Sequence, residues 1–568
     1  MPKKDSLIKG TLILTLAALV ARGLGLFQRV PLDHLWGTKG GLAFGAANNI
    51  YLLLLVFATA GIPSAISKMV SERLELGREA EVQRIYRAAL RFGVIAGIVM
   101  TAGLLIAAPL YARLSHIPYA TLAIRAIAPS LLLFPVIAMM RGYFQGRQFM
   151  TAGGISQIVE QIARVLTAVA LAYALAGWGY DDSYIAAGAA FGSVLGSIGA
   201  FAVMLWYAYK LRQADRGRTE PASSAPASGA GAPSAPSAAA AANAGAGEPP
   251  VLTRTRDIYA AIFRISIPIL LTAMMVQVIY FFDQTVLIPL SDWKFGAATA
   301  ERWGDWLTIR AQSIAGIPPI LAIALSTSLL PVVSAAYASR DMDRVRRQSS
   351  LAMRIAVLSA MPLVLVLATA AHPVTGLIFK TAEGSAIVAV LTGGTIFQIS
   401  MMVSNSILNG LSLQRKAMAH SLAGIGVKIA LSFALTPFFG IYGLLAATSV
   451  CFIFVTVRNM RTIRGIADVK VLGGRWPGFA AAVAVLAAIG AALAHYAAAW
   501  FSPLGWRWPY LLAAALTGAV VCGAYPVLLV ALGVVRAEDV DGFPAKLRKL
   551  IKPFLRLRPR ALQRGDGV

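Results

Sequence analysis

The sequence has few charged residues, almost no cysteine and few histidines. Only 13% of its 568 residues are charged, two are cysteine and five are histidine. Cys451 and Cys522 both lie within apolar segments, which excludes a disulfide framework and a cysteine-based metal cluster. The histidines are scattered along the chain. We therefore expect no metal and no cofactor.

Acidic residues are also scarce, at 25 against 51 basic ones, which gives a net charge of +26. In a soluble protein this excess would indicate a nucleic-acid partner. Here the basic residues lie mostly in short loops between apolar segments and at the C-terminus, where they indicate orientation in a membrane. We expect no nucleic-acid partner.

Long apolar runs are abundant. The chain is 58% hydrophobic with a mean hydropathy of +0.70, and runs of about 20 apolar residues can cross the hydrocarbon core. Segments such as 475–500 are apolar on every face, whereas the strands of a transmembrane barrel would alternate. The sequence therefore predicts an all-α polytopic membrane protein. We predict fourteen spans: 7–31, 42–70, 86–112, 120–146, 152–177, 184–209, 257–290, 306–337, 349–372, 385–412, 417–437, 441–460, 475–500 and 509–534.

The N-terminus begins with the basic-then-apolar order of a signal peptide. Arg22 interrupts the apolar run, which then resumes to Leu32, so we interpret it as an uncleaved first helix. An even number of spans puts both termini on one side of the membrane. Because nearly all the basic loops fall on that side, both termini are expected to be cytoplasmic.

The apolar segments form two matched sets. Pro63 and Pro331 lie in similar contexts, as do Gly142 and Gly410, and both pairs are 268 residues apart. Membrane proteins built from two similar halves usually hold a site between them and move one half against the other. The repeat therefore favours a transporter.

The repeat also predicts the domain organisation. We expect two pseudo-symmetric six-helix lobes, at 1–212 and 254–465, followed by two further spans within 466–535. Residues 213–253 form a Pro/Ala/Gly/Ser tract that cannot bury a core, which predicts a disordered cytoplasmic linker, with a docking segment as the alternative. The basic tail 536–568 either binds anionic headgroups or only determines topology.

Charged side chains inside spans are costly, so each needs a partner or a watery cavity. Arg22 lies past the middle of the first span, and Arg29 lies nearer its outer end, where it either faces a cavity or snorkels to the interface. The seventh span carries Asp283, for which a cation site, an arginine partner and near-interface polarity are equal alternatives. The eighth span carries Arg310 and Gln312.

The fifth span places Glu160, Gln161 and Arg164 on one helical face. Glu160 and Arg164 either pair along the helix or contact substrate. Lys428 occupies the position in the second half that is equivalent to Glu160, and Asn49 adds polarity to the second span. This interior is rich in arginine and amide groups. Since the planar guanidinium suits phosphate, a lipid-linked pyrophosphate fits better than an organic cation.

Several segments resemble a known family. KGTLILTLAALVARGLGLFQRVPL, MRGYFQGRQFMTAGGISQIVEQIARV and IRAQSIAGIPPILAIALSTSLLPVVSAA resemble the stage V sporulation protein B group of polysaccharide biosynthesis proteins. That group belongs to the multidrug, oligosaccharidyl-lipid and polysaccharide (MOP) flippase superfamily. The resemblance covers nearly the whole chain except the linker and the tail.

The resemblance implies two lobes arranged in a V, two additional C-terminal helices that line a groove for the lipid tail, and alternating access. It implies a bacterial plasma-membrane protein whose cargo is the undecaprenyl-linked peptidoglycan precursor, lipid II. By this resemblance Arg22 matches the first-span arginine motif, Arg29 matches its second arginine with a one-residue shift, and Arg310 lies close to the span-eight arginine. Val56 stands near the position where relatives place another arginine.

We therefore expect a flippase for a polyprenyl-pyrophosphate-linked glycan. The candidate substrate-binding residues are Arg22, Arg29, Asn49, Glu160, Arg164, Arg310, Gln312 and Lys428. Asp283 is the candidate for coupling to sodium or protons. Expected partners are membrane lipids and the cell-wall synthesis machinery.

The alternatives are another polyprenyl-linked polysaccharide, a cationic drug, or a non-transporting envelope scaffold. A membrane enzyme would need a catalytic cluster of carboxylates or histidines. Because the outer loops are short and the histidines are scattered, we do not expect an enzyme.

Overall fold

The computed structural model describes residues 20, 23–25, 27–59, 61–219, 255–505 and 507–535, and all regular elements within these ranges are helices. The prediction of an all-α membrane protein is confirmed. The linker 213–253 lies largely, and the tail 536–568 wholly, outside the described residues.

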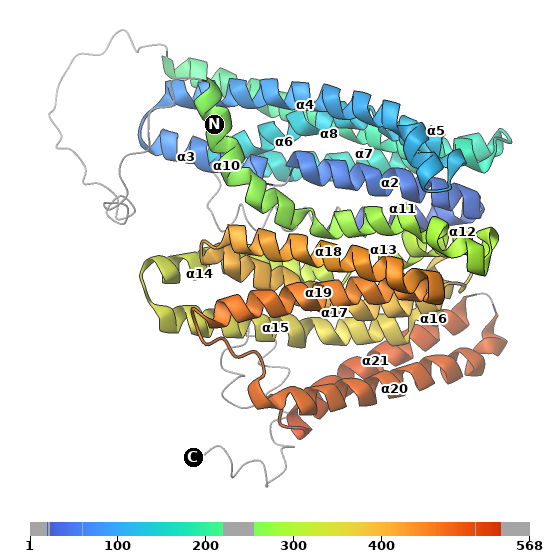
Figure 1. Cartoon of the computed structure of the whole chain (residues 1–568). Helices are drawn as coiled ribbons and strands as arrows, with labels where there is room; N and C mark the ends of the chain where they lie inside the picture. The colour runs from blue at the N-terminus through green and yellow to red at the C-terminus, as the bar shows by residue number, and fades with distance from the viewer. Residues whose placement is uncertain are drawn as a thin grey trace.

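The first helices along the chain pack together as one group, drawn from blue to cyan-green in Figure 1. Residues 27–35 are helical and lead into this group. Its members are α2 (Thr38–Thr59), α3 (Ile62–Glu75), α4 (Glu79–Leu114), the 3₁₀ turn η1 (Pro118–Ala120), α5 (Thr121–Ile127), α6 (Ser130–Gly146), α7 (Met150–Gly177) and α8 (Asp182–Thr219). We call these the N-terminal group.

The next helices form a second group, which apart from α10 lies beneath the first in Figure 1. Its members are α10 (Thr255–Ala273), α11 (Met275–Phe295), α12 (Ala297–Asp305), the π-helical turn η2 (Trp306–Ala311), α13 (Gln312–Ala315), α14 (Pro319–Ala338), α15 (Met342–Thr369), α16 (Ala371–Ile378), α17 (Ser385–Gly410), α18 (Gln414–Phe439) and α19 (Ile441–Arg464). We call these the C-terminal group.

Two further long helices, α20 (Trp476–Trp500) and α21 (Trp508–Ala531), pack against each other and against α15 and α16. The short 3₁₀ turns η3 (Gly473–Arg475) and η4 (Ser502–Leu504) precede them. In Figure 1 this pair, drawn in red, lies on the side of the C-terminal group away from the N-terminal group. It covers an apolar core shared with α14, α15 and α17.

The predicted count of fourteen spans is not confirmed. Among the described residues, ten helices are long and apolar enough to cross a membrane, or twelve if two bent pairs each count as one span. The first predicted span, 7–31, lies largely outside the described residues. The eighth, 306–337, is interrupted by η2 and by the segment before Pro319, which separates it into α13 and α14.

Glycines allow several helices to approach closely. A Cβ atom built on Gly192 of α8 would lie 2.6 Å from the Cβ of Ala168 on α7, and one on Gly97 of α4 would lie 2.4 Å from the Leu132 carbonyl oxygen on α6. Small residues at such contacts let helix backbones approach where lipid gives no hydrophobic driving force for association.

The helix pair α2–α3 spans the interface between the two groups. Near the start of α2, a Cβ on Gly41 or Gly45 would collide with Asp305 or Thr308 of the C-terminal group. At the start of α3, Gly61 has a φ of +81°, and a Cβ there would lie 2.7 Å from the Ser266 carbonyl oxygen of α10. The groups thus meet at two levels along α2–α3.

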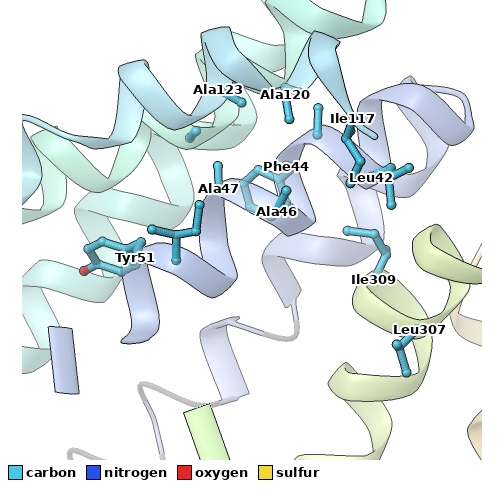
Figure 2. Packing of buried hydrophobic residues seen from close by; sticks show 14 of the residues in the cluster. Leu42, Phe44, Ala46, Ala47, Tyr51, Ile117, Ala120, Ala123, Leu307 and Ile309 are labelled. Atoms are coloured by element: carbon cyan, nitrogen blue, oxygen red, sulfur yellow. The ribbon is translucent and has the colours of Figure 1, made fainter. Parts of the chain in front are cut away.

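Apolar side chains fill both levels. Figure 2 shows Leu42, Phe44 and Tyr51 of α2 with Ile309 of η2 in the first of these cores. This level lies away from the basic loops, and we call it the Asp33 end. The second core joins α3, α4, α6 and α8 to Ile258 and Ile262 of α10, next to the basic loops. We call it the α10 end.

Candidate functional site: a polar cavity between the helix groups

A cavity of about 500 Å³ lies between these two levels. It is lined by residues of the helical stretch before α2, of α2, α7, α11 and α13, and of the segment from α13 to the start of α14. The lining residues are Gly23, Gly25, Gln28, Arg29, Phe44, Asn48, Asn49, Leu52, Gln161, Arg164, Gln277, Tyr280, Gln312, Ser313, Gly316, Ile317 and Ile320. Both halves of the chain therefore contribute to one polar site.

The charge of this lining is entirely positive. Its charged side chains are Arg29 and Arg164, and no aspartate or glutamate of the described residues lines it. Amide side chains supply most of the remaining polarity. A site with guanidinium and amide donors and no carboxylate suits an anion such as a phosphate.

Arg29 reaches from the first helix to the C-terminal group. Its Nη1 donates to the Thr308 carbonyl oxygen and to Ser313 Oγ, both at 2.7 Å. The sequence left two alternatives for Arg29, a cavity or the membrane interface. The side chain lies against the cavity and helps to join the two groups.

Arg164 belongs to a buried network in the N-terminal group. Its Nη2 donates to Glu160 Oε1 at 3.1 Å and to Tyr51 Oη at 2.6 Å. The other oxygen of Glu160 accepts from Arg141 Nη2 at 2.9 Å, which also donates to Ser156 Oγ. The structure thus contains the i,i+4 pair of Glu160 and Arg164 considered from the sequence. Glu160 lies behind Arg164 and neutralises part of its charge.

Three buried N–H donors around the cavity have no acceptor among the described residues. They are Asn49 Nδ2, Arg164 Nε and Gln312 Nε2. A buried donor without an acceptor costs about 1–3 kcal/mol. Because all three are donors, the arrangement favours a ligand rich in oxygen acceptors.

Arg310 is not part of this lining. Its Nη1 donates to the Thr381 carbonyl oxygen, to Thr381 Oγ1 and to the Glu383 carbonyl oxygen, at 3.2, 3.0 and 2.7 Å. Its Nη2 lies 3.6 Å from Asp33 Oδ1, and both side chains are buried. Asp33 also accepts from the backbone N–H of Lys380 at 2.9 Å.

We call the contact of Asp33 with Arg310 and the 380–383 loop the Asp33 latch. It joins the end of the first helical segment to the C-terminal group. The π-helical turn η2 directs Arg310 toward this loop, while Thr308 of the same turn faces α2 and Gln284. Turns of this kind often occur at functional sites.

Lys428 and Asp283 form a separate buried pair inside the C-terminal group. Lys428 Nζ lies 2.6 Å from Asp283 Oδ1, and neither residue lines the cavity.

The structure brings together only some of the predicted site residues. Four of them meet at the cavity: Arg29, Asn49, Arg164 and Gln312. Glu160 supports the cavity, and Arg310, Lys428 and Asp283 lie elsewhere. Arg22 lies outside the described residues. Tyr51, Arg141 and Asp33 are not among the residues that the sequence predicts for the site.

A multi-pass helical fold with a polar cavity between two groups of helices is that of a membrane transporter. Solved structures of such proteins resemble this one. The chain superposes with a TM-score of 0.61 on a structure described as lipid II flippase MurJ in an inward closed conformation, at 13% identity, with 91% of this chain and 98% of that chain covered. An inward-facing multidrug resistance MATE family transporter of the MOP superfamily gives the same TM-score at 14% identity, covering 78% and 93%.

The chain belongs to the polysaccharide biosynthesis protein family, whose sequence pattern matches residues 7–337. Residues 306–511 also match the family described as lipid II flippase MurJ. The stage V sporulation protein B of Bacillus subtilis (strain 168) is 24% identical over 97% of this chain and 100% of its own length. The lipid II flippase MurJ of the same organism is 23% identical over 79% and 81%. The predicted resemblance to the MOP flippase superfamily is confirmed.

Proposed function

We propose that this protein flips a polyprenyl-pyrophosphate-linked glycan from the cytoplasmic to the outer leaflet of a bacterial plasma membrane, with lipid II as the cargo. Membership of a flippase superfamily supports the kind of activity. The printed name of one relative, the lipid II flippase MurJ of Bacillus subtilis, supports this choice of cargo.

The composition of the cavity carries the proposal. Two arginines, three unpaired buried donors and no lining carboxylate among the described residues favour a pyrophosphate. Arginine forks bind phosphate oxygens with charge-assisted hydrogen bonds, which are about twice as strong as neutral ones. An organic cation would instead leave both arginines facing a like charge.

The cavity volume sets how much of the cargo it holds. At about 500 Å³ it falls in the range of small-ligand pockets. We propose that the pyrophosphate and the first sugar bind here. The rest of the glycan enters when the two groups separate, and the lipid tail stays in the membrane.

Alternating access follows from the two levels of contact. We propose that the α10 end faces the cytoplasm, since the basic loops lie there, and that the Asp33 end faces outward. The Asp33 latch and the apolar core around Leu42 and Ile309 close the outward end. Contacts of α10, such as the Tyr259 hydroxyl donating to the Ala88 carbonyl oxygen, restrict the cytoplasmic end. Opening one end while the other stays closed moves the cargo.

A reconstituted flipping assay tests the cargo class. Proteoliposomes would be loaded separately with fluorescent analogues of a polyprenyl-pyrophosphate glycan, of a polyprenyl-monophosphate glycan and of a lipophilic cation. We expect flipping of the first, slower flipping of the second and none of the third. Equal rates for all three would exclude headgroup recognition and indicate a scramblase.

Variants connect that activity to the cavity. Arg29→Gln removes the charge and, because glutamine is shorter, also the bonds of Nη1 to Thr308 and Ser313. It should lower the flipping rate about tenfold or more. Arg346→Gln is the matched control, since its side chain is exposed and remote from the cavity. Equal loss in both variants would point to surface charge rather than to the cavity.

The remaining alternatives give different outcomes. Another polyprenyl-linked polysaccharide as cargo predicts flipping of pyrophosphate analogues that carry other glycans but not of lipid II. A non-transporting scaffold predicts no flipping of any cargo, and unchanged cell growth with Arg29→Gln. A link to the cell-wall synthesis machinery would appear as co-purification of its membrane components with the full chain.

A further inference from the structure

A lysine side chain occupies a site made entirely of oxygen atoms inside the C-terminal group. Lys428 Nζ lies 2.6 Å from Asp283 Oδ1, 2.9 Å from Ser432 Oγ and 3.0 Å from the Leu444 carbonyl oxygen. The surrounding oxygens come from α11, α18 and α19. The site therefore ties three helices together around one positive charge.

The ammonium donates two hydrogen bonds and forms one ion pair with these neighbours. It has three N–H bonds and no acceptor capacity, and it meets a carboxylate, a hydroxyl and a carbonyl. The short approach to Asp283 is that of an ion pair. Lys428 and Asp283 have side chains only 1% and 3% exposed, so neither charge is screened by solvent.

The Thr448 hydroxyl adds a further contact to the Asp283 carboxylate and to the Leu444 carbonyl oxygen. The Thr448 hydroxyl lies 3.4 Å from Asp283 Oδ2 and 3.2 Å from the Leu444 carbonyl oxygen, and can donate to either. The Phe282 ring lies 5.8 Å from Lys428 Nζ and covers the group. A rigid set of carboxylate, carbonyl and hydroxyl oxygens is the kind of environment that binds hard metal cations in proteins.

We propose that Asp283, Ser432 and the Leu444 carbonyl form a monovalent-cation site whose cation is supplied by the chain itself, as the ammonium of Lys428. The site needs no free sodium while Lys428 is present. Shortening Lys428 converts it into a site for a free monovalent cation. This goes beyond the proposed function, because it concerns an ion site outside the cavity lining and holds for any cargo.

The two halves of the repeat carry buried residues of opposite charge at the position of Lys428. Lys428 and Glu160 are 268 residues apart, the same offset as the other repeated positions, and carry opposite charges. Glu160 is balanced by Arg141 and Arg164, and Lys428 by Asp283. Each half thus balances its own buried charge at this position. In the C-terminal group, the ammonium of Lys428 occupies the place that a bound cation would take beside Asp283.

The wild-type protein gives the first test. The full chain, purified in detergent, would be heated in sodium chloride, potassium chloride and choline chloride at equal ionic strength. We expect the same Tm in all three salts, because the ammonium already fills the site. A sodium-specific rise in the Tm of the wild type would overturn the proposal.

Variants of Lys428 give the second test. In Lys428→Ala the removed side chain leaves space beside an unbalanced carboxylate, so sodium should raise the Tm by a few degrees over choline, saturably. Lys428→Met is the matched control: it fills the same space without charge and should show no cation-specific change. The double variant Lys428→Ala/Asp283→Asn should also lose the response.

Lys428→Ser provides a second variant that adds an oxygen ligand. A folded Lys428→Ala or Lys428→Ser protein whose Tm is indifferent to sodium, potassium and lithium would overturn the proposal. Failure of both variants to fold in sodium would also overturn it, since a filled site should restore them. Because the readout is stability, these results do not depend on whether the protein flips lipid II.

Discussion

Asp33→Ala should weaken the closure of the Asp33 end, which we propose faces outward. In the closed structure, the Asp33 carboxylate accepts from the Lys380 backbone N–H at 2.9 Å and pairs with Arg310 at 3.6 Å. These contacts join the two helix groups, so they are lost when this end opens. Removing the carboxylate therefore destabilises the closed state relative to the open one.

The structure indicates how large the effect should be. A hydrogen bond to a charged group contributes about 1.5–3 kcal/mol. Breaking a buried ion pair by removing one partner costs about 3–5 kcal/mol when the other charge is left bare. Arg310 keeps its contacts with Thr381 and Glu383, so the lower figure applies. A shift of about 2 kcal/mol corresponds to about a thirtyfold change in the ratio of open to closed protein.

Accessibility labelling measures that ratio. A single cysteine in the cavity lining, Asn48→Cys, would be placed in a chain whose Cys451 and Cys522 are replaced by alanine. A membrane-impermeant maleimide added from outside to right-side-out vesicles reaches the cysteine only when the Asp33 end is open. The labelling rate should rise by about the thirtyfold factor derived above in the Asp33→Ala variant.

Glu383→Ala is the control for this experiment. Its side chain is exposed on the same loop, while only its backbone carbonyl accepts from Arg310, so the labelling rate should stay unchanged. An unchanged rate in Asp33→Ala, or equal increases in both variants, would refute the latch.

Three further predictions concern other positions. Gly41→Ala should also increase outside labelling of the cavity, because its Cβ would lie 1.8 Å from Asp305 Oδ1 and prevent closure; normal labelling would contradict this. Arg22→Ala should abolish flipping in the reconstituted assay with protein levels intact, and normal flipping would contradict the headgroup role given to Arg22. Gly192→Leu should lower the free energy of unfolding by about 1–3 kcal/mol, seen as a lower Tm in detergent, because its side chain would collide with Ala168 on α7.

The all-helical membrane class and most of the spans could be predicted from the sequence, because they depend on local composition. Apolar runs predict spans directly, and twelve of the predicted spans have a matching helix or bent helix pair. The eighth span departs from this pattern. A π-helical turn at Trp306–Ala311 and the break before Pro319 depend on how the chain packs against α2, which no local pattern encodes.

The candidate site was only partly predictable, because some of its features depend on local sequence and others on contacts between distant segments. Arg29, Asn49, Arg164 and Gln312 could be predicted because polar groups inside spans are costly, and these four meet at the cavity. The pairing of Glu160 with Arg164 follows from their i,i+4 spacing.

Contacts between distant segments could not be predicted in this way. Arg310 was chosen for its charge, but its partner Asp33 is on another span, and η2 directs the guanidinium away from the cavity. Asp283 and Lys428 were considered separately, although the structure joins them. No spacing rule connects residues on separate helices, so these pairs required the three-dimensional arrangement.

Complementation of a strain depleted of its own lipid II flippases tests the central claim most directly. The full chain would be expressed in such a strain, and lipid II exposed at the outer leaflet would be measured, with Arg29→Gln alongside at equal membrane level. The proposed function predicts restored exposure by the wild type and loss in the variant. Absence of lipid II at the outer leaflet, despite good expression of the wild type, would contradict it.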